Sequence, residues 1–146
     1  MRKKLLPMTK LVQTKEELKN NLEKADIYMT GSDQVWGPIL YGGYEWAYML
    51  DFAPEDKKKV AFAASFGKMD IDKETAEAMR IYLKRYDSIA VRENQADKLL
   101  RSWGLNSTQV IDPTLLINAQ GWKKLLNYSD NKKKGKYVLI YQIHNN

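Results

Sequence analysis

Asp26-Ile27-Tyr28-Met29-Thr30-Gly31-Ser32-Asp33-Gln34-Val35-Trp36 is the stretch that decides the fold of this chain. Its short apolar run ends abruptly in Gly-Ser-Asp-Gln, which is typical of a buried strand that delivers a polar loop to one edge of a sheet. Gly31 lets the backbone turn or approach a ligand closely because it has no Cβ. The hydroxyl, carboxylate and amide that follow it could bind a sugar or an anion. The alternative is a turn in which Ser32 or Asp33 only caps the next element.

Length and composition indicate a globular protein. The 146 residues suit one domain of ordinary size, with 44% apolar and 29% charged residues. No apolar run approaches the roughly 20 residues of a membrane-spanning helix, and the basic N-terminal cluster is not followed by the apolar core of a signal peptide. The chain has no cysteine for a disulfide framework or a thiolate zinc site. We therefore expect a cytoplasmic protein, with a peripheral position at the inner membrane surface as the alternative.

The net charge of +6 comes from 24 Lys and Arg against 18 Asp and Glu. Lysines gather at Lys57–Lys59 and in residues 132–136. A nucleic-acid site would need this charge on one face together with stacking aromatics, so we expect no nucleic-acid partner. Both runs flank predicted strands and indicate solvated loops. The alternative is that they attract phosphorylated substrates or an anionic membrane surface.

Predicted strands and helices alternate along the chain. The expected strands are Asp26–Thr30, Val60–Phe66, Ser88–Val91, Thr108–Ile111 and Lys136–Ile143. The first expected helix starts at Thr14 and has Leu18, Leu22 and Ala25 on one face, and the second starts at Asp72. The third contains Ala96, Leu99, Leu100 and Trp103 and is capped by Gly104, and the last contains Trp122, Leu125 and Leu126. This alternation predicts right-handed crossovers and an α/β fold with a mainly parallel sheet. The continuous apolar run from Val60 predicts a strand covered on both faces.

Polar clusters follow the predicted strands, where each strand ends. They are Gly31–Gln34, Ser65 with Gly67, Arg92 with Glu93, Asp112–Thr114, and His144 with Asn145. In a parallel sheet these positions converge on the carboxyl edge, where open α/β folds bind ligands. The opposite edge would carry Lys57–Lys59, Asp87, Asn106 with Ser107, and residues 132–136, a mixture suited to solvent.

Five segments carry a family resemblance. They are Gly31–Trp36 (Gly-Ser-Asp-Gln-Val-Trp), Leu50–Pro54, Ala61–Gly67, Val91–Glu93 and Asp112–Leu116. In order and spacing they resemble the polysaccharide pyruvyl transferase family, and the resemblance covers nearly the whole chain. The family usually has Asn between the Trp and the Pro of the first segment, where this chain has Gly37.

The resemblance implies one half of a larger architecture. Family members are similar to two-domain glycosyltransferases, with twin Rossmann-like halves that face a cleft, and they begin with a strand upstream of the region that Met1 opens here. Residues 1–126 would then be the N-terminal Rossmann-like domain without its first strand, residues 127–135 a linker, and residues 136–146 the start of a truncated second domain. We expect such a fragment to be inactive alone, and its last strand to be free to pair with a sheet edge or with a second copy, giving a dimer.

The resemblance also implies a reaction. The family transfers a pyruvyl group from phosphoenolpyruvate to a sugar of a cell-surface polysaccharide or its precursor, forming a ketal. The partners would be phosphoenolpyruvate and a glycan acceptor, lipid-linked or free, with no cofactor beyond the donor substrate.

Arg92 suits the phosphate or the carboxylate of the donor, with an ordinary ion pair as the alternative. Asp33 is the preferred carboxylate, as a base or as a binder of sugar hydroxyls.

The remaining candidates are weaker. His144 has a titration range suited to proton transfer, but it equally fits a frayed terminus. Glu93 and Asp112 are further acid or base candidates, although Asp-Pro-Thr more often shapes a turn; Thr114 could donate to phosphate. The expected substrate-binding positions also include Gly31, Ser32, Gln34, Ser65 and Gly67. No nucleophile-elbow pattern surrounds Ser65, so it is not expected to act as a covalent nucleophile.

Aromatic residues gather between the first two strands. Tyr41, Tyr44, Trp46, Tyr48 and Phe52 could form a sugar-stacking platform, but packing of this irregular segment onto the sheet is the favoured interpretation. No ligand spacing typical of zinc or calcium sites is present, so no metal is expected. No P-loop or dinucleotide-binding motif is present either, which argues against nucleotide hydrolysis and dinucleotide binding.

Two other functions remain open. One is a nucleotide-sugar glycosyltransferase half-domain. The other is a non-catalytic remnant that binds a carbohydrate or an anion.

Overall fold

The computed structural model describes residues 8–39, 43–126, 135, 136, 138 and 140. The chain divides into two compact units, residues 1–113 and residues 114–146, and each is described by itself. The predicted domain limits at residues 126 and 136 stay predictions.

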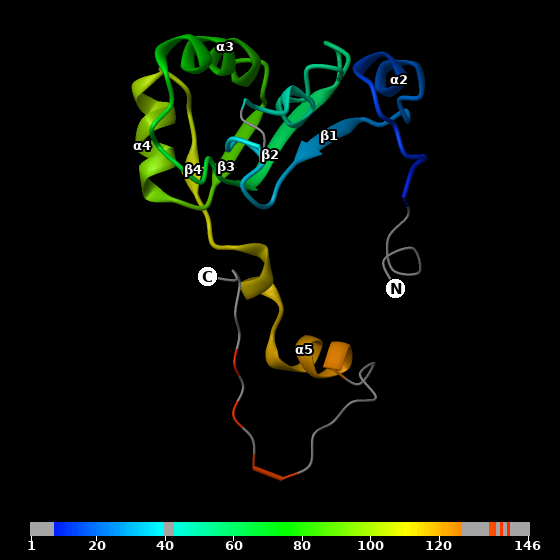
Figure 1. The fold of residues 1–146 in the computed structure, drawn as a ribbon, viewed down its shortest axis with the longest axis vertical. Helices are drawn as coiled ribbons and strands as arrows, with labels where there is room; N and C mark the ends of the chain where they lie inside the picture. The colour runs from blue at the N-terminus through cyan, green and yellow to red at the C-terminus, as the bar shows by residue number, and fades with distance from the viewer. Residues whose placement is uncertain (1–7, 40–42, 127–134, 137, 139, 141–146) are drawn as a thin grey trace. The chain divides into compact units, whose positions relative to one another are not determined.

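The first unit is built on a four-stranded parallel sheet (Figure 1). Its strands are β1 (Ile27–Thr30), β2 (Lys58–Ala64), β3 (Ser88–Val91) and β4 (Thr108–Gln109), and they lie in the order β1-β2-β3-β4. This sheet with its helices confirms the predicted α/β fold. Of the expected strand 136–143, the structure describes only Lys136, Val138 and Ile140, and none of the three is in a strand.

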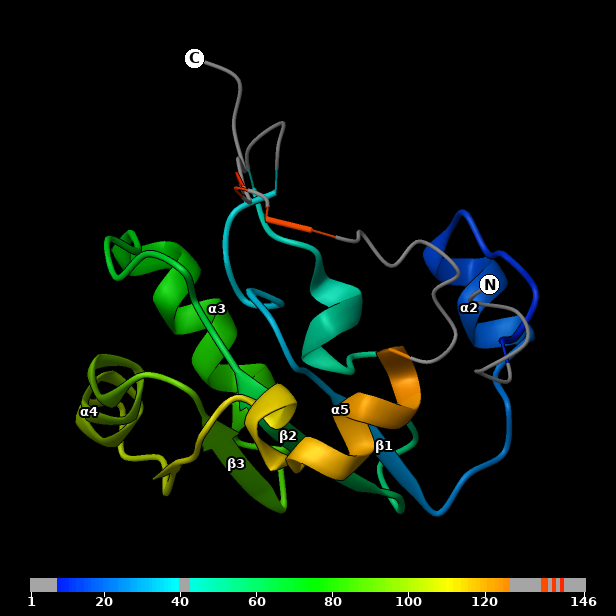
Figure 2. The same cartoon turned by 90° about the horizontal axis from the view of Figure 1, so that it is seen from below.

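The connections between the strands cover one face of the sheet. They contain the 3₁₀ helix η1 (Trp46–Met49), α3 (Lys73–Leu83) and α4 (Asn94–Ser102), and Figures 1 and 2 show α3 and α4 side by side. Successive strands are added in one direction, so right-handed crossovers place every connection on the same face. The core forms there, with Ala61, Ile89 and Val91 of the strands packed in one cluster with Met79, Leu83 and Leu100 of the helices.

The other face of the sheet is open at β1. Side chains alternate between faces along a strand, and Ile27 and Met29 are 51% and 60% exposed. Val60 and Phe62 of β2 are only half-buried, whereas Ala61 and the residues from 63 to 66 are buried. β2 is thus covered fully on one face and only partly on the other, which is less than the cover on both faces that its apolar run predicted.

The first helix, α2 (Lys15–Asn20), begins as predicted but ends early. The Thr14 side chain accepts a hydrogen bond from the Glu17 amide at 3.1 Å, as an N-cap does. The side chain of Asn21 donates to the Glu17 carbonyl at 2.8 Å and so replaces a backbone partner at the C-terminal end. Leu22 and Ala25 consequently lie beyond the helix rather than on its apolar face.

The next two helices have the predicted caps. The Asp72 side chain accepts from the Thr75 amide at 2.9 Å, and α3 starts at the following residue, Lys73. Gly104 follows α4 with φ +76°, and the Leu105 amide donates back to the Leu100 carbonyl at 3.0 Å. Glycine adopts this left-handed conformation without strain, which is why the helix stops there.

The amino edge of the sheet differs from the sequence prediction. Lys59 is only 1% exposed, and its Nζ donates to the carbonyls of Pro54 at 2.6 Å and Lys57 at 2.9 Å. Ser107 is also buried and donates to Asp97. The predicted solvated edge is therefore wrong for these two residues, because loop carbonyls and a helix carboxylate replace water as their partners.

The second unit contains two short helical elements among its described residues. They are η2 (Pro113–Leu116), which starts at the boundary between the units, and α5 (Ala119–Leu126). The Asn118 side chain accepts from the Gly121 amide at 2.9 Å and so holds the start of α5. Within the described residues of the whole chain, no helix is long and apolar enough to cross a membrane.

Candidate functional site

The loop that follows β1 lies against the end of β2. Gly31 has φ +113°, and a Cβ on it would lie 2.1 Å from the Phe62 carbonyl oxygen, so only glycine fits this close approach. The Ser65 amide donates to the Asp33 carbonyl at 3.0 Å, which extends the parallel pairing one step beyond the strands. The backbone of Asp33 is thereby held, while its side chain is 81% exposed.

Trp36 anchors the other end of this loop in the core. It is fully buried, and its ring lies 5.2 Å from that of Phe66 and 6.2 Å from that of Tyr86, measured between centroids. Its amide donates to the Ser65 carbonyl at 3.1 Å. The polar residues 31–34 are therefore held between a sheet edge and a buried tryptophan.

Ser65 and Gly67 shape the turn after β2. Ser65 is buried, and its hydroxyl accepts a hydrogen bond from the Gly67 amide at 3.0 Å. A Cβ on Gly67 would lie 2.7 Å from Oε1 of Gln34, so the Gln34 side chain occupies the space that glycine leaves open. Ser65 thus supports the backbone here, and Gln34, which is exposed, supplies the accessible polar group.

The same packing explains the glycine at position 37. Gly37 is buried, and a Cβ there would lie 2.8 Å from the Phe66 carbonyl oxygen and 3.3 Å from that of Gln34. The asparagine expected from the resemblance would not fit this backbone. Glycine at this position therefore allows the close contact between the loops after β1 and β2 that this chain has.

Arg92, directly after β3, lies among three carboxylates. Its Nη1 donates to Oδ2 of Asp112 at 2.8 Å, its Nη2 lies 3.5 Å from Oδ1 of Asp33, and its Nε lies 3.6 Å from Oε1 of Glu93. The Arg92 side chain is 22% exposed. The structure thus brings together four predicted site residues from three strand ends, with a formal charge of one cation against three anions.

The contact with Asp112 dominates the electrostatics of Arg92. The hydrogen bond to this carboxylate raises the pKa of the guanidinium, burial acts in the opposite direction, and the charges of Glu93, Asp112 and Asp33 add to the increase. Arg92 is therefore always protonated. Its Nε is buried and has no hydrogen-bond partner in the part of the chain that the structure describes. The Nε–Nη2 edge is consequently held less firmly than Nη1.

Gln109 is a neighbour of this cluster that the sequence did not reveal. Its side-chain amide donates to the Arg92 carbonyl at 3.1 Å from the end of β4. The backbone of Arg92 is also held on the other side, because its amide donates to the Ala64 carbonyl at 3.1 Å. Only the position of Gln109 at a strand end could have suggested this role.

The other predicted site residues lie elsewhere. Ser32 is half-buried in the loop after β1, and Thr114 belongs to the second unit. His144 lies outside the described residues. In the described part of the chain, no group of three or more His, Cys, Asp or Glu has the arrangement of a metal site.

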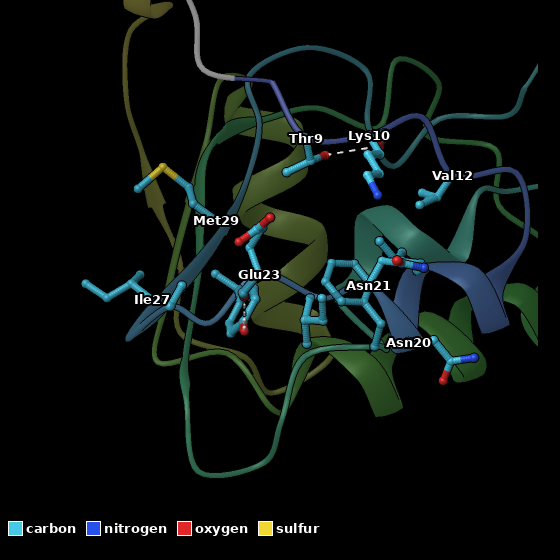
Figure 3. Close-up of a pocket in the computed structure, with 13 residues that line it drawn as sticks. Thr9, Lys10, Val12, Asn20, Asn21, Glu23, Ile27 and Met29 are labelled. Carbon is cyan, nitrogen blue, oxygen red and sulfur yellow. Dashed lines mark hydrogen bonds between the residues drawn. The ribbon is translucent and has the colours of Figure 1, made fainter.

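Two of the hollows formed by the described residues of the first unit border β1. The larger, of about 580 Å³, is shown in Figure 3 and lies between α2 and β1; its lining includes Leu18, Leu22, Ala25, Tyr28 and Phe52 but none of the predicted site residues. The smaller, of about 410 Å³, is lined by Met29, Thr30, Gly31, Ser32, Asp33, Gln34, Val35 and Tyr48. The predicted polar loop therefore borders the smaller hollow.

The fold and this arrangement define an α/β protein with a polar candidate site at the carboxyl edge of a parallel sheet. The sequence model of one family, Polysaccharide pyruvyl transferase, matches residues 2–146. The chain belongs to this family, which is a family of transferases. No curated protein and no solved structure match the chain.

Proposed function

We propose that this chain takes part in the transfer of a pyruvyl group from phosphoenolpyruvate to two hydroxyls of a sugar in a cell-surface polysaccharide or its precursor. The methylene carbon of the donor takes up a proton, and a sugar hydroxyl attacks the carbon that carries the phosphate and gives up its own proton. The bond between that carbon and the phosphate oxygen breaks, inorganic phosphate leaves with one proton, and a second hydroxyl closes the cyclic ketal as it loses its proton. The reaction needs an anion site for the donor and a base beside the acceptor, and it needs no further cofactor.

Arg92 is the proposed anion-binding residue. Its Nη1 is tied to Asp112 at 2.8 Å, whereas Nη2 and Nε have carboxylates only at 3.5 Å and 3.6 Å. A guanidinium N–H donates a strong hydrogen bond to a carboxylate or a phosphate, and Nη2, whose contact with Asp33 is long at 3.5 Å, is the proposed donor group, since Nε is buried. The observation that supports the proposal most directly is that Arg92 has one short contact with a carboxylate and two long ones.

Asp33 is the proposed base. Its carboxylate is exposed, its backbone is held by Ser65, and its Oδ1 lies 3.5 Å from Nη2 of Arg92. An anion that binds Arg92 would compete with this long contact and release the carboxylate for a sugar hydroxyl. Glu93, at 3.6 Å from Arg92, is the second carboxylate in reach of the donor.

Calorimetric titration of the 146-residue chain with phosphoenolpyruvate tests the proposal. Arg92→Ala should weaken binding about tenfold or more, because it removes the cation and its charge-assisted hydrogen bond to the donor. Arg80→Ala, on the exposed face of α3, is the matched control and should bind like the parent chain. Binding of a nucleotide sugar with no response to phosphoenolpyruvate would overturn the proposal in favour of a glycosyltransferase half-domain.

A further inference from the structure

We propose that the hollow beside the loop 31–34 is the subsite for the acceptor sugar, and that the ring of Tyr48 is the platform on which a pyranose stacks. The inference rests on the proposed function, because it takes Arg92 as the place of the donor. It identifies a sugar as the ligand of the hollow and Tyr48 as a residue that determines which sugar binds.

The walls of the hollow match the two kinds of surface on a pyranose. Ser32, Asp33 and Gln34 supply a hydroxyl, a carboxylate and an amide, while Met29 and Tyr48 supply apolar surface. A pyranose has hydroxyls around its rim and C–H groups on its faces, and polarised C–H groups suit the negative face of an aromatic ring. The volume of about 410 Å³ lies within the range of small-ligand pockets.

Tyr48 differs from the other aromatic residues of its segment. Tyr44 stacks on Trp46, and Trp46 stacks on Tyr82, with centroids 6.4 Å and 5.4 Å apart, while Phe52 packs edge-on against Tyr28. These rings pack onto the protein, as the favoured interpretation of the sequence predicted, while Tyr41 lies outside the described residues. Tyr48 is 48% exposed, lines the hollow and stacks on no other ring within the described residues.

The backbone of Tyr48 is fixed although its ring is open. Its carbonyl accepts hydrogen bonds from Nε1 of Trp36 and from the hydroxyl of Tyr86, each at 3.3 Å, and its amide donates to the Glu45 carbonyl at 3.1 Å. Trp36 is fully buried. Because the backbone is already held, a ligand that stacks on this ring has only the side-chain torsions of Tyr48 to order.

The position of Asp33 connects the hollow to the proposed donor site. Asp33 lines the hollow, and its Oδ1 also lies 3.5 Å from Nη2 of Arg92. A sugar that stacks on Tyr48 is therefore next to the proposed base, and the base is next to the proposed donor site. This order of groups is what the attack of a sugar hydroxyl on the donor requires.

The test measures binding of simple sugars to the full 146-residue chain. Methyl β-D-galactopyranoside, methyl β-D-glucopyranoside and methyl α-D-mannopyranoside are titrated into isotope-labelled protein and followed by two-dimensional NMR, with and without phosphoenolpyruvate. At least one glycoside should shift the amide signals of the loop 31–34. Tyr48→Ala should weaken that binding roughly twofold to tenfold, while Tyr48→Phe, which keeps the ring, should retain it.

Trp122→Ala is the matched control, because Trp122 is 41% exposed and does not border the hollow. Tyr48→Ala should still fold, since the hydrogen bonds of Tyr48 to Trp36 and Tyr86 use its backbone; a retained two-dimensional NMR spectrum outside the surroundings of residue 48 checks this. Unaltered glycoside binding by Tyr48→Ala, or no glycoside binding by the parent chain, overturns the inference. Glycoside binding that needs Tyr48 in a chain that does not bind phosphoenolpyruvate would support the subsite and overturn the proposed function, so the two failures are distinguishable.

Discussion

Nη1 of Arg92 donates to Oδ2 of Asp112 at 2.8 Å and so joins the residue after β3 to the segment after β4. Arg92 and Asp112 are 20 positions apart in the sequence. Asp33, which follows β1 and also lies near the guanidinium, is 59 positions from Arg92. The carboxyl edge of the sheet is thus organised around one cation whose firmest contact is with a protein carboxylate.

Replacing Arg92 should destabilise the fold as well as weaken donor binding. Arg92→Ala leaves Asp33, Glu93 and Asp112 without their shared cation, and we expect the free energy of unfolding to fall by about 1–3 kcal/mol. Urea denaturation measures this change. Arg80→Ala on α3 should stay within about 0.5 kcal/mol of the parent chain. Equal stabilities of the two variants would mean that the cluster contributes nothing to folding.

Lys58 and Lys59 should respond differently to the same substitution. Lys59→Met keeps the apolar stem but leaves the carbonyls of Pro54 and Lys57 without their ammonium donor, so we expect a loss of about 1–3 kcal/mol. Lys58 is exposed, and Lys58→Met should change stability by less than about 0.5 kcal/mol. Thermal and urea unfolding of both variants make the comparison. A neutral Lys59→Met would show that the side chain is solvated after all.

Gly31 and Gly43 separate a steric clash from backbone strain. Both have positive φ, +113° and +77°, but a Cβ on Gly43 meets no atom within 4 Å, whereas one on Gly31 meets the Phe62 carbonyl oxygen at 2.1 Å. Gly43→Ala should therefore cost about 1–2 kcal/mol from its left-handed conformation alone. Gly31→Ala should cost clearly more, because the loop must also move away from β2. If urea unfolding gave the same loss for both, the close approach at Phe62 would be disproved.

Asp97 should make stability depend on pH in the acidic range. The hydrogen bond from the Ser107 hydroxyl, at 2.6 Å, is the main cause that lowers the pKa of this carboxyl, and Arg101 lowers it further. A lowered folded-state pKa gives stability that is present above the usual aspartate pKa of about 3.9 and is lost as the pH falls through the folded-state value.

Asp97→Asn should therefore be less stable than the parent chain at neutral pH, and the difference should shrink below about pH 4, where the parent chain itself takes up the proton. Urea unfolding at a series of pH values measures this difference. Asp26→Asn is the control, because Asp26 is exposed. A difference that stayed constant down to the acid limit would contradict the assignment of the titration to Asp97.

Local patterns predicted the elements well. Thr14 and Asp72 cap helices and Gly104 ends one, because a cap depends on residues within one turn of the chain. The order of strands and helices predicted a parallel sheet, and polar residues placed after strands predicted which side chains would meet at its carboxyl edge. The proximity of Asp33, Arg92, Glu93 and Asp112 follows from that topology.

Burial and the choice of partners could not be predicted from such patterns. Lys59 looked like part of a solvated run, yet it is buried, because Pro54, Lys57 and Asp87 provide its hydrogen bonds. The role of Gln109 and the difference between Tyr48 and its aromatic neighbours likewise depend on contacts with other segments.

The sequence by itself determined the α/β class, the start of α3, the end of α4, the family, and the edge of the sheet at which the polar loop lies. These properties follow from periodicity, capping and strand order, which act over short stretches or through chain direction. Only the tertiary structure decided that one face of β1 is open, that Arg92 is held mainly by Asp112, and that Tyr48 faces the hollow beside Asp33. Packing between distant segments determines which side chains lose water and which partners replace it, and a single sequence does not encode that packing locally.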